Sequence, residues 1–373
     1  MESQYTVEII KDFNMMDDLA AEWNELAPPN SVKPWQSFSW HRSIAKANEK
    51  ESFLRIFTVR KNGRLLAIAP MVLRQSEQPL KPWRLGFIGE EELKEPNWFV
   101  GSDPGALNML VDAIIEERVH PVRLSRIPSD LESLFSIVEK FKNKGWITKI
   151  AHMPYPFLDL DGNTIKKSLQ KDLKRARKKA EKYGTLSFKA ISDTEQGNLR
   201  QYLNEFLQIE ASGWKGDNQT AILSNNSRKN FFENYAISAF KDGVLRLFFL
   251  MLDGKAVAVQ YGVESANAFW LLNIGFDEQY RDCSPGNLLL EESIKYASQN
   301  DLIHYNLLGK DEPWTKRWTT TSRDSIILAA YKLNYHGMKA ILSDILYLSR
   351  KQIRGFKQQG SNKFFSLKKI WKA

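Results

Sequence analysis

The sequence predicts an α/β (α+β) protein built from two tandem units, each with a mixed sheet. A chain of 373 residues with 43% hydrophobic residues is long enough to form two domains with sizeable cores. Each half contains two apolar runs joined by a glycine turn, at Asn62-Gly63 and at Asp253-Gly254, which is a sequence signal of a β-hairpin. Each half also contains helices and a strand–helix–strand order. We therefore expect two copies of one fold, the alternative being a chance similarity of element order.

The expected N-terminal unit ends near residue 150. Apolar periodicity predicts helices at Asp17–Leu26, Ser39–Ala47, Leu107–Arg118 and Leu131–Lys144, and strands at Leu54–Arg60, Arg64–Arg74 and Val122–Ile127. Gly145 is expected to end the last of these helices, because glycine readily adopts the conformation that closes a helix.

The expected C-terminal unit begins near Met153 and repeats this plan. Its helices are expected at Ile165–Tyr183, Glu195–Ala211 and Pro285–Gln299, and its strands at Leu186–Ala190, Val244–Leu252, Ala256–Val263, Ala268–Phe276 and Leu302–Leu308. An amphipathic helix is expected at Met338–Arg354. The division is therefore into residues 1–152, 153–336 and 337–373, the last being a basic amphipathic tail.

Cysteine and histidine usage argues against disulfides and metal centres. Cys283 is the single cysteine and the five histidines are scattered, so neither an internal disulfide nor a metal site is expected. The N-terminus lacks a basic segment followed by an apolar one, and no apolar run approaches the ~20 residues of a membrane span. We expect a cytoplasmic protein, with peripheral contact at the inner face of the membrane as an alternative.

The net charge of +9 is concentrated in two segments, 166–182 and 339–372. In the first, one narrow apolar face is expected, formed by Leu169, Leu173, Ala176 and Ala180. The basic remainder is either a solvated face or a landing site for a polyanion such as CoA phosphates, an acidic carrier protein, tRNA or anionic lipid. Aromatic residues are not interleaved with these basic residues, which argues against readout of single-stranded nucleic acid.

The C-terminal tail mixes basic residues with large apolar ones, at Phe356, Phe364, Phe365, Leu367, Ile370 and Trp371. This composition is typical of segments that adsorb to anionic membranes. A disordered tail and a segment packed on the domain are the alternatives.

The stretch from Arg281 to Ala297 follows a strand-like run and combines a turn with an amphipathic helix. Ser284 suits the N-cap and Pro285 the first helical turn. Because Gly286 carries no side chain, backbone N–H groups there are left uncovered and form an anion site that fits a diphosphate. The alternative is an ordinary helix start.

The pattern Arg281-x-x-Ser284-x-Gly286 resembles the pyrophosphate loop of the GNAT acyltransferase superfamily, with Ser284 in place of the first glycine. Residues 155–318 resemble its CelD-like branch, which is related to the Fem-type transferases built from two GNAT-like domains. The motifs are Tyr155-Pro-Phe-Leu-Asp-Leu160, Ser168-Leu-Gln-Lys-Asp-Leu-Lys-Arg-Ala-Arg177, Glu210-Ala-Ser-Gly-Trp-Lys-Gly216 with Thr220-Ala221-Ile222, Ser284-Pro-Gly-Asn-Leu-Leu-Leu290 and Gly309-Lys-Asp-Glu-Pro-Trp-Thr-Lys-Arg-Trp318. The first half adds Pro34-Trp-Gln-Ser-Phe-Ser-Trp40, Ala67-Ile-Ala-Pro-Met71 and Trp83-Arg-Leu-Gly-Phe-Ile-Gly89.

The resemblance implies transfer of an acyl group from acetyl-CoA or another acyl-CoA to a nucleophile. The pantetheine arm is expected between two diverging strands, Ala268–Phe276 and Ile303–Leu308. The residues implied in cofactor binding are Asn273, Ile274, Gly275, Phe276, Arg281, Ser284, Gly286 and Asn287.

Glu210 is the expected general base, because it ends a helix with an apolar face and a carboxylate in an apolar cleft has a raised pKa. Its alternative is a helix-terminal Glu that anchors a loop. Trp214 and Lys215 are expected to line the acceptor pocket, with packing and a solvated lysine as alternatives.

Relatives often carry a tyrosine where this chain has Trp314, so we expect Tyr280 to act as the general acid. Tyr305, water or the use of no dedicated acid are the alternatives. Lys316 and Arg317 are expected to contact phosphate or an acidic acceptor, unless they are a solvated basic loop.

These features predict an acyl-CoA-dependent N- or O-acyltransferase. The resemblance implies that its acceptor is an amino or hydroxyl group of a sugar or cell-envelope precursor of the kind used in polysaccharide production. The alternatives are a Fem-type transferase that uses aminoacyl-tRNA, and a non-catalytic GNAT-like scaffold at the membrane surface.

Overall fold

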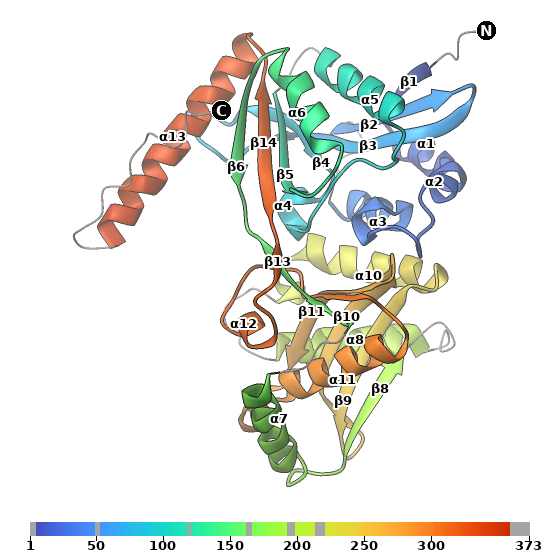
Figure 1. Ribbon diagram of the computed structural model, residues 1–373, viewed down its shortest axis with the longest axis vertical. Coiled ribbons are helices and arrows are strands. Elements are labelled where there is room, and N and C mark those ends of the chain that lie inside the picture. The colour runs from blue at the N-terminus through green and yellow to red at the C-terminus, as the bar shows by residue number, and fades with distance from the viewer. Residues whose placement is uncertain are drawn as a thin grey trace.

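The computed structural model describes residues 5–48, 53–117, 121–161, 166–191, 198–212 and 221–358, with side chains up to residue 350. Within them the chain forms two seven-stranded mixed sheets, one in each unit (Figure 1). The strand orders are β1-β2-β3-β4-β5-β14-β6 and β13-β7-β12-β11-β10-β9-β8. The expected fold class is thereby confirmed.

The N-terminal unit begins with strand β1, two short helices and α3. Its strands are β1 (Tyr5–Ile10), β2 (Leu54–Lys61), β3 (Arg64–Gln75), β4 (Trp83–Phe87), β5 (Val122–Pro128) and β6 (Trp146–Ala151). Its helices are α1 (Phe13–Asp18), α2 (Ala20–Leu26), α3 (Phe38–Asn48), α4 (Glu90–Leu93), α5 (Pro104–Glu116) and α6 (Leu134–Lys142). A 3₁₀ turn, η1, covers Pro34–Gln36.

The C-terminal unit repeats the central part of this order. Its strands are β7 (Tyr155–Asp159), β8 (Leu186–Ile191), β9 (Leu245–Leu252), β10 (Lys255–Ser265), β11 (Ala268–Phe276), β12 (His304–Asn306) and β13 (Ser322–Arg323). The next strand along the chain, β14 (Ser325–Tyr331), belongs to the first sheet. Its helices are α7 (Lys167–Ala180), α8 (Leu199–Ala211), α10 (Asn226–Lys241), α11 (Pro285–Gln299), α12 (Thr315–Trp318) and α13 (Tyr335–Gln358). The 3₁₀ turns are η4 (Ile222–Ser224) and η5 (Glu278–Cys283).

The same sequence of elements builds the centre of each unit. In the first unit the hairpin β2–β3 and strand β4 are followed by α5 and by β5, which runs parallel to β4. In the second, the hairpin β9–β10 and strand β11 are followed by α11 and by β12, which runs parallel to β11. The two units are therefore copies of one fold.

The units exchange strands. β6 is the edge of the first sheet, and β7, four residues further along the chain, pairs with β12 of the second sheet. After β13, which pairs with β7, the chain returns and β14 inserts between β5 and β6. A boundary at residue 152 therefore separates β6 from β7, but it leaves β14 on the wrong side of the division. Strand partners this far apart in sequence carry no local signal.

An apolar interface joins the units. Trp40 of α3 contacts Phe231 and Tyr235 of α10 edge-to-face, with ring centroids 5.0 and 5.1 Å apart. Trp35 meets Trp270 of β11 in the same manner at 5.0 Å. These rings belong to one hydrophobic cluster that runs through both units. Since each such pair contributes ~0.5–1.5 kcal/mol beyond its buried area, the contact holds the units as one body.

Two helical layers cover the second sheet. Helices α8 and α10 lie on the face turned toward the first unit, and α7 and α11 lie on the opposite face (Figure 1). The expected apolar face of α7 is confirmed, because the buried residues of this helix are Leu169, Leu173, Ala176 and Ala180.

Candidate functional site

The two parallel strands of the second sheet diverge after three residue pairs. β11 and β12 are in register at Ala268 and His304, and they are last in register at Trp270 and Asn306. β11 continues to Phe276, whereas β12 ends at Asn306. The opening beyond Trp270 and Asn306 is the arrangement expected for the acyl donor. It also explains why β12 is shorter than the strand expected at Leu302–Leu308.

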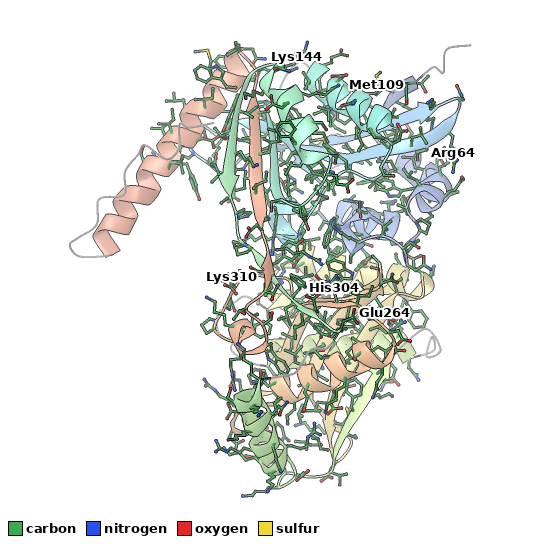
Figure 2. The ribbon with its side chains drawn as sticks, in the orientation of Figure 1. Arg64, Met109, Lys144, Glu264, His304 and Lys310 are labelled. Carbon is green, nitrogen blue, oxygen red and sulfur yellow. The ribbon has the colours of Figure 1, made fainter. Side chains whose placement is uncertain are left out.

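The chain after β12 is bent away from β11. The Leu307 N–H donates to the carbonyl of Pro156 in β7 at 3.0 Å. Leu308 and Gly309 then adopt left-handed conformations, with φ of 53° and 57°. The buried guanidinium of Arg126 donates a hydrogen bond to the Gly309 carbonyl. This segment is one edge, or lip, of the opening, and the N-terminal unit holds it in place. His304, at the start of β12, and Lys310, just past Gly309, lie near the junction of the units (Figure 2).

The other lip, on β11, is packed against α8. A Cβ atom at Gly275 would lie 2.5 Å from the Cα atom of Glu210, so this close approach requires glycine. Glu210 itself is 1% exposed, and its Oε2 accepts a hydrogen bond from the Ile222 N–H at 2.9 Å. This contact is the loop anchor that the sequence left as the alternative, and the role of Glu210 as a base stays a prediction.

The helix start after β11 leaves few free donors. Ser284 adopts a left-handed conformation with φ of 50°, and Pro285 has no N–H. The N–H groups of Asn287 and Leu288 both donate to the Ser284 carbonyl, at 3.0 and 3.2 Å. Gly286 therefore provides the one first-turn N–H that has no acceptor among the described residues. The anion site therefore offers fewer backbone donors than the sequence suggests.

Side chains also lie beside this turn. A Cβ atom at Gly286 would lie 3.4 Å from a ring atom of Phe276 and 3.9 Å from Ile274. The Asn287 side chain accepts a hydrogen bond from the Trp318 indole at 3.3 Å. Arg281 is 80% exposed and lies 3.8 Å from Glu278, so its guanidinium is turned to solvent.

Tyr280 and Glu210 lie on opposite faces of the second sheet. The ring of Tyr280 packs edge-to-face on Tyr183 at 5.4 Å, and Lys255 lies 5.4 Å from its centroid. Tyr280 adjoins the hydrophobic cluster of α7 and α11, whereas α8 with Glu210 covers the other face. The structure therefore does not bring the expected acid and base together. The alternative acid, Tyr305, is fully buried and bonded to Ser293 at 2.9 Å, and burial raises its pKa.

The expected acceptor contacts are divided between α12 and a segment outside the described residues. Lys316 pairs with Asp311 at 3.3 Å, and Arg317 pairs with Asp172 of α7 at 2.9 Å. Both side chains are exposed, at 59% and 45%. Trp214 and Lys215 lie outside the described residues.

The sequence missed a buried polar group at the β12 lip. Arg126 has φ of 58° and donates to the Lys94 and Gly309 carbonyls. Its guanidinium lies 3.7 Å from the Glu95 carboxylate and 5.8 Å from the centroid of the Tyr155 ring. Arg126 Nε and Glu95 Oε2 are buried without a hydrogen-bond partner among the described residues. Unpaired buried groups and left-handed backbone are common at functional sites.

Burial changes the protonation of this group. It raises the pKa of Glu95 to about 7, although the charges of Arg126 and Arg228 act in the opposite direction. It also raises the pKa of Tyr155 to about 12. A carboxyl group that titrates near neutral pH is suited to accept a proton from a nucleophile. The feature of the sequence that could have indicated this group is an arginine, Arg126, within the apolar strand expected at Val122–Ile127.

The equivalent opening in the N-terminal unit is closed. β4 and β5 are in register at one pair, Leu85 and Val122. The Glu90 carboxylate bridges the two strands: it accepts a hydrogen bond from the Ser125 N–H at 3.0 Å and lies against Gly86. Burial raises the pKa of Glu90 to about 7. Of these two pairs of parallel strands, β11 and β12 are therefore the pair that leaves an opening between them.

A basic surface borders the second sheet on the side of α7. Arg177 is tied to Glu291 and Glu292 of α11 at 2.9 and 2.5 Å. The remaining basic side chains of this helix are exposed: Lys167, Lys171, Lys174, Arg175, Lys178 and Lys179. α7 also packs on η5, which leads into the start of α11. The surface therefore adjoins the segment between β11 and α11.

The described residues hold no group of three or more His, Cys, Asp or Glu side chains arranged to bind a metal ion. None of the described helices combines the length and the apolarity that crossing a bilayer requires.

Comparison with known families identifies the second unit. Residues 167–316 match the family model described as an acetyltransferase (GNAT) domain. The match spans α7 to α12 and includes both lips of the opening. Residues 167–316 therefore form a GNAT domain, and this part of the chain has the GNAT fold. No curated protein sequence matches the chain.

Solved structures match the fold over both units. The C-terminal domain of a putative lysylphosphatidylglycerol synthetase from Agrobacterium fabrum is 11% identical, with a TM-score of 0.57 and coverage of 89% of this chain and 97% of that one. L-PGS from Bacillus licheniformis is 12% identical, with a TM-score of 0.55 and coverage of 90% and 98%. FemX is 14% identical, with a TM-score of 0.51 and coverage of 87% and 97%. The resemblance to tandem-GNAT proteins is thus confirmed at the level of fold.

Proposed function

We propose that this protein transfers an aminoacyl group from aminoacyl-tRNA to an amino or hydroxyl group of a cell-envelope or saccharide precursor. The observation that carries the proposal is the divergence of β11 and β12. Glu210 packs against the β11 side of the opening, and Arg126 of the N-terminal unit bonds to the segment that follows β12. A donor bound along β11 would meet an acceptor at the junction of the units.

The exposed cations of α7 support a nucleic-acid donor. They adjoin the start of α11 and present a surface wider than one diphosphate needs. Because phosphate contacts release counterions, such a surface favours tRNA over a small coenzyme and makes the binding salt-dependent. The likeness in fold to FemX and to L-PGS agrees with this donor class, since the Fem-type transferases that the sequence resembles use aminoacyl-tRNA.

In the proposed reaction, the acceptor nitrogen or oxygen bonds to the carbonyl carbon of the donor ester. The bond from that carbon to the ribose oxygen breaks, and the ribose leaves as a hydroxyl after it takes a proton. The proton lost by the acceptor passes to a carboxylate. Glu210 and Glu95, one at each lip, are the candidates for that carboxylate.

An acyl-CoA donor is the second candidate. The family model is that of an acetyltransferase domain, and the free Gly286 N–H supports one contact to a diphosphate. Gly286→Ala distinguishes this candidate, because the added methyl group has room in the fold but would occupy the approach of a phosphate. It should weaken acetyl-CoA binding at least tenfold and leave tRNA binding within twofold.

Titration calorimetry with aminoacyl-tRNA and with acetyl-CoA, at two salt concentrations, tests the proposal. A Lys171→Glu, Lys174→Glu, Lys178→Glu variant should bind tRNA at least tenfold more weakly and with a smaller salt slope. The matched control is Arg64→Glu, Lys142→Glu, Lys149→Glu, which changes the same charge on exposed residues of the N-terminal unit. Saturable binding of acetyl-CoA with no binding of tRNA would instead establish the second candidate.

A further inference from the structure

Helix α13 carries a stripe of apolar side chains that no other described element covers. Tyr335, Met338, Leu342 and Ile345 are 71%, 67%, 50% and 46% exposed. Their spacing of three, four and three residues places them on one side of the helix. The helix extends from the first sheet away from both units (Figure 1), so the stripe lies on an arm of the molecule.

The opposite side of α13 is fixed to the first sheet. Asp344 accepts hydrogen bonds from the buried Arg84 of β4 at 2.8 and 3.0 Å and from the Tyr331 hydroxyl at 2.5 Å. Ala340 and Ser343 are fully buried, and the Ser343 hydroxyl donates to the Pro79 carbonyl. These contacts set the rotation of the helix about its axis, and the stripe therefore points away from the body.

The charge on α13 is almost entirely positive. Its sequence contains the basic residues Lys339, Arg350, Lys351, Arg354 and Lys357. The single acidic residue of the helix, Asp344, is neutralised on the inner side. Among the described residues, no carboxylate forms an ion pair with Lys339 or Arg350. The helix thus combines an outward apolar stripe with uncompensated cations.

We propose that the outer side of α13 binds an anionic lipid bilayer and lies in the plane of its interface. Apolar side chains flanked by lysine and arginine are suited to insert below the headgroups while the cations contact lipid phosphates. This inference does not depend on the reaction that the GNAT domain catalyses.

Charge favours an anionic bilayer over two other partners for this side of α13, a second α13 and the segment 359–373 of the same chain. A second α13 would bring the same excess of cations to the contact, so pairing between copies is opposed by repulsion. The segment 359–373 of this chain is also basic, with Lys363, Lys368, Lys369 and Lys372 and no acidic residue. The outer side of α13 is therefore complementary in charge to an anionic surface.

Two exposed residues near the N-terminal end of α13 add to the apolar surface formed by its stripe. Trp146 of β6 is 55% exposed and is in register with Tyr331, the last residue of β14. Leu333 is 75% exposed and lies between β14 and α13. Tryptophan and tyrosine favour the headgroup level of a membrane, so Trp146 and Tyr335 suit its edge.

Flotation with vesicles tests the proposal on the full chain. The protein should bind vesicles of phosphatidylcholine with 30% phosphatidylglycerol at least tenfold better than phosphatidylcholine alone. Met338→Glu, Leu342→Glu should reduce binding at least tenfold, and Lys339→Glu, Arg350→Glu should remove the preference for phosphatidylglycerol. The matched control is Phe135→Glu, Ile237→Glu, which adds the same charge at exposed apolar residues of other helices.

Three results would overturn the proposal. The first is absence of vesicle binding by the unchanged protein. The second is unchanged binding by the Met338→Glu, Leu342→Glu variant together with loss of binding on removal of residues 359–373, which would assign the membrane contact to that segment. The third is a dimer that the same variant converts to a monomer, which would assign the stripe to a second copy. Circular dichroism and the melting temperature confirm that each variant is folded.

Discussion

The guanidinium of Arg126, on a strand of the N-terminal sheet, donates a hydrogen bond to the carbonyl of Gly309, just past the end of β12 in the other unit. Arg126 is 3% exposed and also bonds to the Lys94 carbonyl. One buried side chain therefore connects the N-terminal unit to the lip of the opening between β11 and β12, and several consequences can be measured.

Replacing Arg126 with methionine should lower the free energy of unfolding by about 3 kcal/mol, because it leaves two carbonyls and the Glu95 carboxylate without their buried partner. Urea denaturation measures the change. Arg64→Met is the control, since Arg64 is 74% exposed and its loss should cost less than about 0.5 kcal/mol. Equal effects of the two substitutions would contradict the coupling of the units through Arg126.

Glu95 should make the protein less stable as the pH rises. Its folded pKa of about 7 lies above the ordinary value of 4.5, so the folded state holds the proton more tightly than the unfolded state. The resulting stabilisation is complete below pH 4.5 and is lost as the pH rises to 7, by about 3 kcal/mol at the limit.

Glu95→Gln should remove this part of the pH dependence. The stability of the variant relative to the unchanged protein should increase from pH 5 to pH 8, as measured by urea denaturation at both values. Glu90 also titrates near 7 and remains in both proteins, so only the difference between them reports on Glu95. A difference that is constant with pH would show that Glu95 ionises normally.

Gly275→Ala should disrupt the packing of β11 on α8. The new methyl group would lie 2.5 Å from Glu210 Cα, and backbone must move to relieve the contact. We expect a loss of about 2 kcal/mol in unfolding free energy, in the range that overpacking costs. Gly286→Ala is the control, because its methyl group has ordinary contact distances and lies in a helix, where alanine is favoured by ~1 kcal/mol. The melting temperatures should change in opposite directions.

Glu210→Gln separates the two roles of Glu210. The glutamine side-chain oxygen can still accept the hydrogen bond from the Ile222 N–H, so stability should change by less than about 1 kcal/mol. If Glu210 is the base, transfer of the acyl group should fall by at least ~10²-fold, because an amide does not accept the proton. If Glu210→Gln stays active and Glu95→Gln is inactive, the base is Glu95 and not Glu210.

Local sequence signals predicted the elements of this fold well. Asn62 and Gly63 have φ of 52° and 82°, and Asp253 and Gly254 have 46° and 79°, as the tight hairpins expected there require. The buried face of α7 and the start of α11 at Pro285 follow from side-chain spacing and from helix-start chemistry. Each of these depends on residues close together in the chain.

Contacts between distant residues could not be predicted. β14 pairs with β5 and β6, and nothing in its own sequence selects those partners over the second sheet. Glu95, Arg126 and Tyr155 meet only because three separate segments converge at the junction. For the same reason, the sequence placed Tyr280 in one site with Glu210, although a sheet lies between them.

The exchange of strands imposes an order on biosynthesis. The first sheet lacks its sixth strand until Tyr331 has left the ribosome, by which time nearly the whole second unit has been made. Until then β5 and β6 present open edges that invite pairing with other chains. A gene fragment that stops before residue 325 would therefore yield an incomplete, aggregation-prone first sheet, and no single cut of the chain separates a complete first sheet from the second unit.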